Sequence, residues 1–404
     1  MLSLKILDQE LVINSKYYKE ILRLLNAPSR LIGGCVRDAI LGRPSIDIDI
    51  TTSLPPEQVL NTLSQHNVKV IQTGIKFGGV TAIFQDEQFE ITTLRKDINC
   101  TGRHAIVSFS TDFVEDARRR DFTINALSYC PFERKIYDYF HGIDHLNQKK
   151  VVFIGNPSER ITEDFLRILR FFRFSAIYAE DIDQEGLLAC IDLKHGLTNL
   201  SKERIKWEMD KLIILKKAYY MLDNMFSAGI LQVIFPISNF DPIAFIQSIN
   251  FAKEMNVELE KTSLYALLFH HTNYISHKDL INLKFSNKES TQISSMLNSM
   301  NEDKSVNIKY LLKKLWLENF NEYIQHIIIL RGINRIDTNL AKEFIIKYTA
   351  KSRPKFPVSG NDLLKLDISG KAIGKNIKFL ENIWIETEFT LNKEQLLKMV
   401  QNDK

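Results

Sequence analysis

The sequence has few cysteines and no long apolar run. Its cysteines, Cys35, Cys100, Cys130 and Cys190, are scattered without C-x-x-C spacing. This pattern argues against a zinc ribbon and against a disulfide framework. Residues 1–26 mix acids with lysines and have no long apolar core, so we expect neither a signal peptide nor a membrane anchor. These absences predict a protein of the reducing cytoplasm without a membrane partner.

A strong charge of one sign is also missing. The formal net charge is +4 over 404 residues, which permits a polyanionic partner without requiring one. Short-period repeats and low-complexity linkers are absent as well. With 45% apolar residues, the chain can bury more than one hydrophobic core. Composition therefore predicts an ordinary soluble protein of two or three domains.

The pattern of apolar residues changes along the chain. Residues 1–147 alternate β-rich segments with short helical ones, whereas from residue 148 apolar residues recur at intervals of three and four. The fold class is therefore α+β, a small catalytic head followed by helices only. We expect a head at 1–147, a neck at 148–225, a body at 226–352 and a tail at 353–404, where prolines and a glycine break helix.

A glycine pair precedes an alternating acidic strand. Gly33 and Gly34 open a short helix, and the next strand carries Asp47 and Asp49. Alternation puts both carboxylates on one face, roughly 6.5 Å apart, with isoleucines on the other. Two such carboxylates suit Mg²⁺, and a glycine turn before a helix suits a triphosphate, which together indicate nucleotidyl transfer. An edge strand with solvated aspartates is the structural alternative.

A third acid is expected near this pair. Transfer assisted by two metal ions needs a further ligand and a group that helps to accept the hydroxyl proton. Glu90, on the predicted strand FEITTL, is the candidate catalytic residue beside Asp47 and Asp49. The alternative for Glu90 is an exposed polar position on an amphipathic strand.

The acidic segment and six later segments resemble one family in the order of their motifs. They resemble the tRNA nucleotidyltransferases and poly(A) polymerases of the DNA polymerase beta-like nucleotidyltransferase superfamily, and most of all the bacterial CCA-adding enzymes. The segments span nearly the whole chain, at 33–50, 77–84, 89–97, 115–129, 160–174, 200–208 and 356–374.

The resemblance implies a polymerase beta-like head and a specific reaction. Enzymes of this type add CCA to the 3′ end of tRNA from CTP and ATP and release pyrophosphate, without a nucleic-acid template. Two Mg²⁺ ions, held by Asp47 and Asp49, are the implied cofactors. A poly(A) polymerase, an enzyme adding only CC or only A, and a catalytically silent RNA-binding protein remain alternatives.

The resemblance also assigns nucleotide-binding residues in the head. It places Arg120, Asp121 and Asn125 at the sugar and triphosphate, beside Gly34. A structural network of arginines and aspartates is the alternative, because the three arginines before Asp121 need nearby anions. Arg37, on the helix after Gly34, can reach a phosphate or close a salt bridge inside the head.

An E-D-x-x-R motif, with Glu163, Asp164 and Arg167, is the expected base reader. On one helix Asp164 and Arg167 would be adjacent, as would Arg167 and Arg170. A carboxylate accepts from the exocyclic amine of C or A and a guanidinium donates beside it, whereas U and G present a carbonyl there. The resemblance implies that this Asp/Arg pair acts as a protein template. A surface salt bridge is the alternative.

The motif E-R-x-x-x-E follows at Glu203, Arg204 and Glu208. Arg204 and Glu208 lie one helical turn apart in this spacing. The resemblance implies a structural brace for the base-reading helix, without a part in the chemistry.

Two further segments are interpreted through the resemblance. The polar segment 95–107 suits a mobile loop over the nucleotide. The tail around Ser359, Gly360 and Asp362 is expected near tRNA, with backbone amides available to phosphate. Asp367 stands where a glycine is expected in the following turn.

Overall fold

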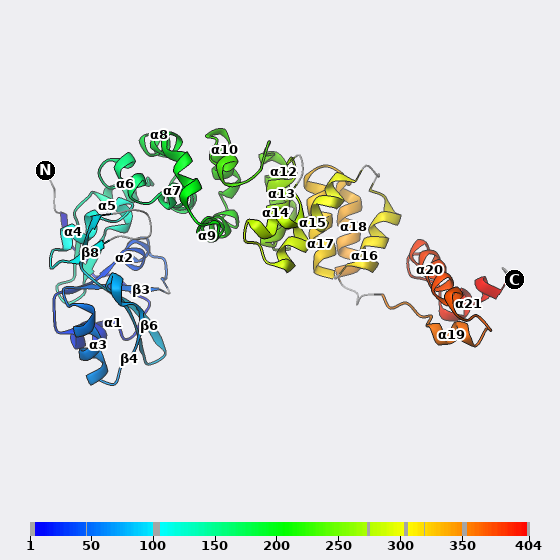
Figure 1. The fold of residues 1–404 in the computed structure, drawn as a ribbon, viewed down its shortest axis with the longest axis horizontal. Helices are drawn as coiled ribbons and strands as arrows, with labels where there is room; N and C mark the ends of the chain where they lie inside the picture. The colour runs from blue at the N-terminus through cyan, green and yellow to red at the C-terminus, as the bar shows by residue number, and fades with distance from the viewer. Residues whose placement is uncertain are drawn as a thin grey trace. The chain divides into compact units, whose positions relative to one another are not determined.

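A computed structural model describes the chain at residues 5–45, 47–99, 106–272, 275–302, 306–318, 320–349 and 354–401. The chain forms two compact units, Met1–Phe235 and Pro236–Lys404 (Figure 1). Within the described ranges, no helix combines the length and the apolar character needed to span a bilayer.

A mixed eight-stranded sheet is the centre of the first unit. Its strand order is β1-β10-β9-β2-β3-β6-β5-β4, and β3 and β6 are parallel while the other neighbouring pairs are antiparallel. The strands are β1 Lys5–Asp8, β2 Ser29–Ile32, β3 Ile48–Thr52, β4 Lys69–Gly74, β5 Gly79–Phe84, β6 Glu87–Thr93, β9 Ser128–Cys130 and β10 Lys135–Asp138. The parallel pair matters for the site because its strands carry the predicted acids.

Helices cover this sheet and continue beyond it to the end of the first unit. The α-helices are α1 Tyr18–Leu25, α2 Gly34–Ile40, α3 Pro56–Gln65, α4 Phe113–Arg118, α5 Gly142–Asn147, α6 Pro157–Glu163, α7 Leu166–Tyr178, α8 Gln184–Leu193, α9 Lys202–Ile213, α10 Ala218–Ser227 and α11 Leu231–Ile234. The described residues also form the 3₁₀ turns η1 Ile75–Phe77, η2 Thr123–Asn125 and η3 Lys194–Asn199.

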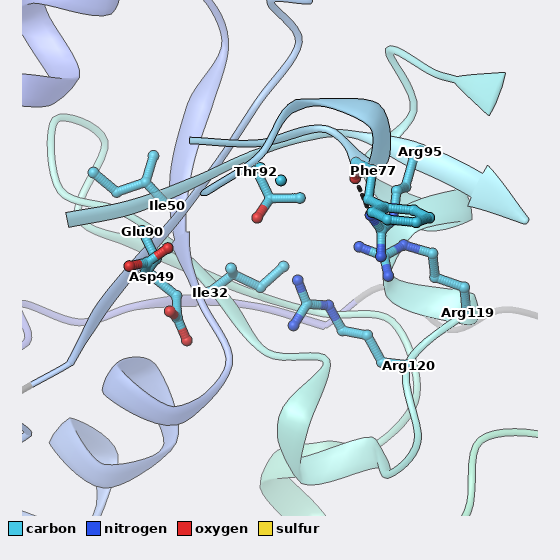
Figure 2. Close-up of a pocket in the computed structure, with 11 residues that line it drawn as sticks. Ile32, Asp49, Ile50, Phe77, Glu90, Thr92, Arg95, Arg119 and Arg120 are labelled. Carbon is cyan, nitrogen blue, oxygen red and sulfur yellow. Dashed lines mark hydrogen bonds between the residues drawn. The ribbon is translucent and has the colours of Figure 1, made fainter. Parts of the chain in front are cut away.

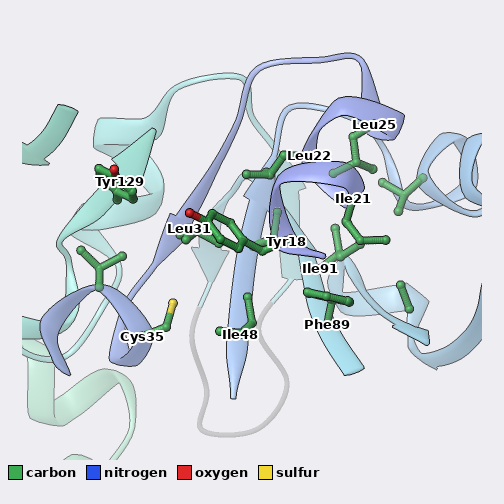
Figure 3. Close-up of a cluster of buried hydrophobic side chains, with 14 of the residues drawn as sticks. Tyr18, Ile21, Leu22, Leu25, Leu31, Cys35, Ile48, Phe89, Ile91 and Tyr129 are labelled. Atoms are coloured by element: carbon green, nitrogen blue, oxygen red, sulfur yellow. The ribbon is translucent and has the colours of Figure 1, made fainter. Parts of the chain in front are cut away.

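One hydrophobic core holds α1 and α3 against the sheet. The amphipathic helix α1 buries Ile21, Leu22 and Leu25, and these side chains belong to the same cluster as Ile48 and Phe89 of the parallel strands (Figure 3). Ile48 and Ile50, the neighbours of Asp49 in the chain, are both buried, as the alternation of β3 predicts. This core fixes the strands whose other face carries the carboxylates.

Cys35 provides a chemical test of this core. Burial raises the pKa of its thiol to about 11, and the side chain is 1% exposed. Since the thiolate is the reactive form, we expect iodoacetamide at pH 8 to leave Cys35 unmodified in the native protein and to label it in urea. Peptide mapping measures both. Equal labelling in the two states would contradict the burial of α2 against the sheet.

A two-stranded hairpin stands where a polar loop was expected. β7 Arg95–Asn99 and β8 Ile106–Phe109 pair antiparallel, with Arg95 opposite Phe109. Backbone pairing of a hairpin does not require apolar alternation, so the sequence pattern missed both strands. Residues 100–105, and with them the predicted loop movement, lie outside the described residues.

The second unit is helical throughout its described residues. Its helices are α12 Pro242–Glu254, α13 Lys261–Phe269, α14 His277–Asn282, α15 Asn287–Asn301, α16 Ile308–Leu317, α17 Phe320–Gly332, α18 Thr338–Thr349, α19 Gly360–Leu364, α20 Lys371–Glu386 and α21 Lys393–Gln401. Strands in the first unit followed by helices confirm the predicted α+β class. The boundaries at 147, 225 and 352 stay predictions.

The predicted tail segment begins with a capped helix. Ser359 and Asp362 form a capping box at the start of α19, with the Ser359 amide donating to Asp362 Oδ2 at 2.9 Å. Asp367 adopts φ 63°, the left-handed conformation for which the sequence led us to expect glycine. Aspartate tolerates this region better than most residues, so the turn is kept without glycine.

Candidate active site

The glycine pair lies at a crowded turn between β2 and α2. Gly33 has φ 75°, and a Cβ atom there would lie 3.4 Å from Arg120 Nη1 and 3.7 Å from the Asn125 carbonyl oxygen. The left-handed conformation and the close approach both favour glycine. Gly34 begins α2, as predicted. The turn therefore brings Gly33 next to two of the predicted nucleotide-binding residues.

Parallel pairing brings the predicted acids together. Asp49 of β3 lies in register with Glu90 of β6, so their side chains share one face of adjacent strands (Figure 2). Asp47 directly precedes β3 and is exposed. Thr81 Oγ1 donates to Glu90 Oε1 at 2.9 Å, and Gln88 Nε2 donates to the same oxygen at 2.9 Å. These bonds orient the Glu90 carboxylate.

The charges around Asp49 favour a cation. Burial raises the pKa of Asp49, the charge of Arg120 opposes this effect, and the charges of Asp47 and Glu90 raise the pKa further. In the described part of the chain, no group of three or more His, Cys, Asp or Glu side chains is arranged to hold a metal ion. Asp49 and Glu90 together suit an ion that takes few protein ligands and completes its shell with water and phosphate, as Mg²⁺ does.

A cavity of about 440 Å³ opens beside these acids. Figure 2 shows the carboxylates of Asp49 and Glu90 on one side and the guanidinium groups of Arg119 and Arg120 on the other. The lining residues are Ile32, Asp49, Ile50, Gly74, Phe77, Gly79, Glu90, Thr92, Arg95, Arg119 and Arg120. An acidic wall facing a basic wall suits a metal-bound polyphosphate.

A buried aspartate anchors the basic wall. The side chain of Asp116 is fully buried; its carboxylate oxygens lie 2.7 Å from Arg119 Nη2 and 3.2 Å from Arg120 Nη2. Burial alone would raise the pKa of Asp116, but the guanidinium groups of Arg120 and Arg119 lower it. Sequence reasoning did not place Asp116 or Arg119 in the site. The acidic residues directly before the three arginines were the available signal.

A chain of buried polar contacts runs inward from α2. Arg37 pairs with Asp38 at 3.0 Å and donates to Asn125 Oδ1 at 2.5 Å. Asn125 Nδ2 donates to Asp121 Oδ1 at 2.9 Å, and Arg170 Nε donates to Asp121 Oδ2 at 2.7 Å. Arg37 is only 6% exposed. Of the two alternatives for Arg37, the structure therefore contains the internal salt bridge.

The same chain continues to α9 through a buried glutamate. Arg173 Nε donates to Glu208 Oε2 at 2.5 Å, and Arg170 Nη1 lies 3.6 Å from Glu208 Oε1. Burial would raise the pKa of Asp121, but the charge of Arg170 and the hydrogen bond from Asn125 lower it. The predicted nucleotide-binding residues are thus linked by side-chain contacts to one residue of the E-R-x-x-x-E motif.

The base-reading motif lies at a break between two helices. α6 ends at Glu163 and α7 begins at Leu166, while Asp164 has extended backbone angles of φ −155° and ψ 106°. The prediction of one helix through Asp164 and Arg167 was therefore wrong. Asp164 Oδ1 accepts from the Leu166 amide at 3.1 Å, and aspartate favours such local bonds at the start of a helix.

The two predicted base-reading side chains hold separate partners in this structure. Asp164 Oδ2 lies 2.8 Å from Arg204 Nη2, in the first turn of α9, where Glu203 also lies. Arg167 Nη1 donates to Glu163 Oε2 at 2.6 Å, and Nη2 donates to the carbonyl oxygen of residue 119 at 2.9 Å. Arg204 thus joins α9 to Asp164 of the motif, and Glu208 joins α9 to Arg170 and Arg173 farther along α7.

Two family descriptions match parts of the chain. Residues 29–152 match the Poly A polymerase head domain, and residues 181–240 match the probable RNA and SrmB-binding site of polymerase A. The first match contains the glycine turn, the parallel strands and the basic wall. Fold and site together define a nucleotidyltransferase of the poly(A) polymerase head class.

Similar proteins narrow this class. The mitochondrial CCA tRNA nucleotidyltransferase 1 of Danio rerio is 32% identical, covering 91% of this chain and 86% of its own. A CCA-adding enzyme of Staphylococcus epidermidis is 28% identical, covering 91% and 92%. The crystal structure of the Bacillus stearothermophilus CCA-adding enzyme with CTP covers 95% and 97%, at 22% identity and a TM-score of 0.73. The chain belongs to the CCA tRNA nucleotidyltransferase family of enzymes.

Proposed function

We propose that this enzyme adds CCA to the 3′ end of tRNA from CTP and ATP and releases pyrophosphate. The observation that carries the proposal is the register of Asp49 with Glu90 beside an arginine-lined cavity, in a chain of this family. The proposed product, a CCA end on tRNA, is taken from the names of the relatives. The relative solved with CTP supports a nucleoside triphosphate as substrate.

Nucleotidyltransferases use divalent metal ions, and the acids of this site fit that role. We propose that Asp47 and Asp49 hold two Mg²⁺ ions, with Glu90 as the third carboxylate. Burial raises the pKa of Asp49 most, and the charges of Asp47 and Glu90 raise it further; this clustered negative charge is the physical reason to expect a cation there. When bound, the metal supplies charge neutralisation at the triphosphate and lowers the pKa of the attacking hydroxyl.

The remaining residues bind and orient the substrates. We infer that Arg119 and Arg120 hold the triphosphate, since Asp116 fixes both guanidinium groups at the cavity. The RNA 3′ hydroxyl would attack the α-phosphorus in line, and Glu90 would help to accept its proton. Asp121 and Asn125 would hold the sugar. Positioning and charge carry most of such a reaction.

We propose that Asp164 and Arg167 select C and A as a protein template, positioned by Arg204. In this structure Asp164 pairs with Arg204, and Arg167 pairs with Glu163. To bind the base edge, each side chain must release its present partner or bond to the partner and the base together. The donors of a guanidinium and the acceptors of a carboxylate suit the Watson-Crick edges of C and A.

Arg167→Ala is therefore expected to reduce the preference for CTP and ATP over UTP and GTP. A lost bidentate contact corresponds to about 10- to 100-fold in discrimination. The measurement is kcat/KM for each of the four nucleotides, with circular dichroism to verify folding. Arg134→Ala removes an exposed arginine, 68% accessible, and serves as the control. Unchanged nucleotide ratios in Arg167→Ala would refute the template role.

Product length tests the activity itself. The protein is incubated with Mg²⁺, labelled tRNA ending at the discriminator base, and CTP, ATP or both. Addition of CCA and no further growth supports the proposal. Long A-only tails on tRNA and unrelated RNA would instead identify a poly(A) polymerase, and products stopping at CC, or growing only from CC, an enzyme of partial specificity.

We further propose that the tail, residues 353–404, contacts tRNA. The capped helix α19 at its start supports this proposal.

We also propose that the protein works in the cytoplasm. The thiols of Cys35, Cys130 and Cys190 are free and buried, so they need no oxidising compartment.

A further inference from the structure

Helix α9 presents an aromatic side chain to solvent. Its inner face buries Ile205, Met209 and Leu212, whereas Trp207 is 53% exposed. Tryptophan is usually largely buried, since its ring carries much apolar surface. Neither the packing of α9 nor its proposed role as a brace accounts for the exposure of this indole.

A lysine lies against this ring. The ammonium of Lys211, one helical turn along α9, lies 3.3 Å from the centroid of the Trp207 ring. This cation–π contact orients the indole and places a positive charge beside it. An aromatic ring next to a cation is the arrangement with which proteins bind single-stranded nucleic acid, since every base has a stacking face and every phosphate a negative charge.

The pair begins one helical turn beyond Arg204, whose Nη2 lies 2.8 Å from Asp164 Oδ2 of the base-reading motif. Partial burial has the largest effect on the pKa of Lys211 and lowers it, and the charge of Arg173 lowers it further. The charges of Glu208 and Asp47 raise this pKa. Asp47 itself is exposed. Trp207 also directly precedes Glu208, whose carboxylate is bound by Arg173. Trp207 and Lys211 therefore lie on α9 among the residues that contact Asp164 of the base-reading motif and Arg173 of α7.

The triphosphate, the incoming base and the RNA end occupy different parts of the site. In the proposed mechanism the triphosphate lies between Asp49 and the wall of Arg119 and Arg120, and the incoming base lies at Asp164 and Arg167. The RNA end must bring its hydroxyl to the α-phosphorus beside the acids. Its last base and phosphate are the groups still without a binding site, and α9 offers them an exposed ring and a cation.

We propose that Trp207 stacks on the 3′-terminal base of the RNA acceptor while Lys211 contacts the adjoining phosphate. This inference rests on the proposed function and adds a site for the acceptor end. Stacking on a ring accepts any base, which suits an acceptor whose terminal base differs from one tRNA to the next and changes during the reaction.

Intrinsic fluorescence tests the contact without catalysis. The chain has three tryptophans, and the other two, Trp316 and Trp384, lie in the second unit and contact each other. In metal-free buffer, a minihelix RNA ending at the discriminator base is expected to quench the emission of Trp207, and Trp207→Phe removes this change. The same stem closed by a loop at that end is the RNA control. Equal quenching by the closed stem, or quenching by CTP or ATP alone, would overturn the proposal.

Steady-state kinetics provides the second test. Trp207→Ala is expected to raise the KM for RNA by about 5- to 150-fold, with little change in the KM for CTP, because one stacking contact is lost. Trp207→Phe should restore most of the affinity. Phe132→Ala, which removes another exposed aromatic ring (51% accessible), is the matched control and should behave as wild type.

The two proposals fail in different ways. A wild-type enzyme that does not extend tRNA refutes the proposed function, and the fluorescence experiment still decides whether RNA reaches Trp207. A wild-type enzyme that adds CCA, together with a Trp207→Ala variant of unchanged KM for RNA, refutes the stacking site alone.

Discussion

Asp49→Asn is expected to lower kcat by about a thousandfold or more while RNA affinity stays unchanged. Asparagine keeps the size of the side chain but removes the charge that would hold the metal ion opposite Glu90. The measurement is nucleotide addition under saturating CTP and tRNA, with RNA binding followed separately by gel shift. Asp47→Ala is expected to show the same separation of turnover from binding.

A matched aspartate distinguishes a site effect from a general effect of charge. Asp86 lies in the turn between β5 and β6 with φ 69°, a conformation that asparagine also accepts. Asp86→Asn should therefore retain normal turnover. Normal turnover in Asp49→Asn would remove the catalytic assignment of the acidic strand.

Asp121→Asn is expected to lower the free energy of unfolding by about 3–5 kcal/mol. Asp121 is 7% exposed and accepts from Asn125 and Arg170, so the variant leaves the largely buried guanidinium of Arg170 without its nearest counter-charge. Urea unfolding followed by circular dichroism measures the change. Glu180→Gln breaks an exposed ion pair with Lys149 and should leave the midpoint unchanged.

The pH dependence of stability gives an independent check on Asp121. Its pKa in the folded state is lowered, so its contribution is fully present above the unfolded value of about 3.9 and is lost as pH falls through the folded pKa. The difference between wild type and Asp121→Asn should thus shrink only in strong acid. A difference already lost at pH 5 would show that the Arg170 pair does not carry the stability.

Local patterns in the sequence predicted the two strands of the head that carry the acids. Alternation around Asp49 and within FEITTL identified β3, β6 and their buried faces because one face of each strand packs on the core. The pairing itself was beyond such reasoning. β4 and β5 come between β3 and β6 in the chain, and the parallel register of Asp49 with Glu90 depends on contacts distant in sequence.

The partners of the charged residues could not be predicted from spacing. Asp164 and Arg167 are three positions apart, yet the helix breaks at Asp164 and the carboxylate pairs with Arg204, 40 positions along the chain. Likewise, only the folded structure shows that Asp116 holds Arg119 and Arg120 together. The partner of a charged side chain depends on tertiary packing, which cannot be deduced from the sequence motif alone.

The register between β3 and β6 also acts as a check on correct folding. A slip of one residue would place Phe89 or Ile91 opposite Asp49 and turn the carboxylate of Glu90 toward the hydrophobic core. Such a chain would lose an acid from the site and bury a charge at once. A misaligned sheet thus yields an unstable and inactive molecule, so errors in strand alignment do not accumulate as enzyme with partial activity.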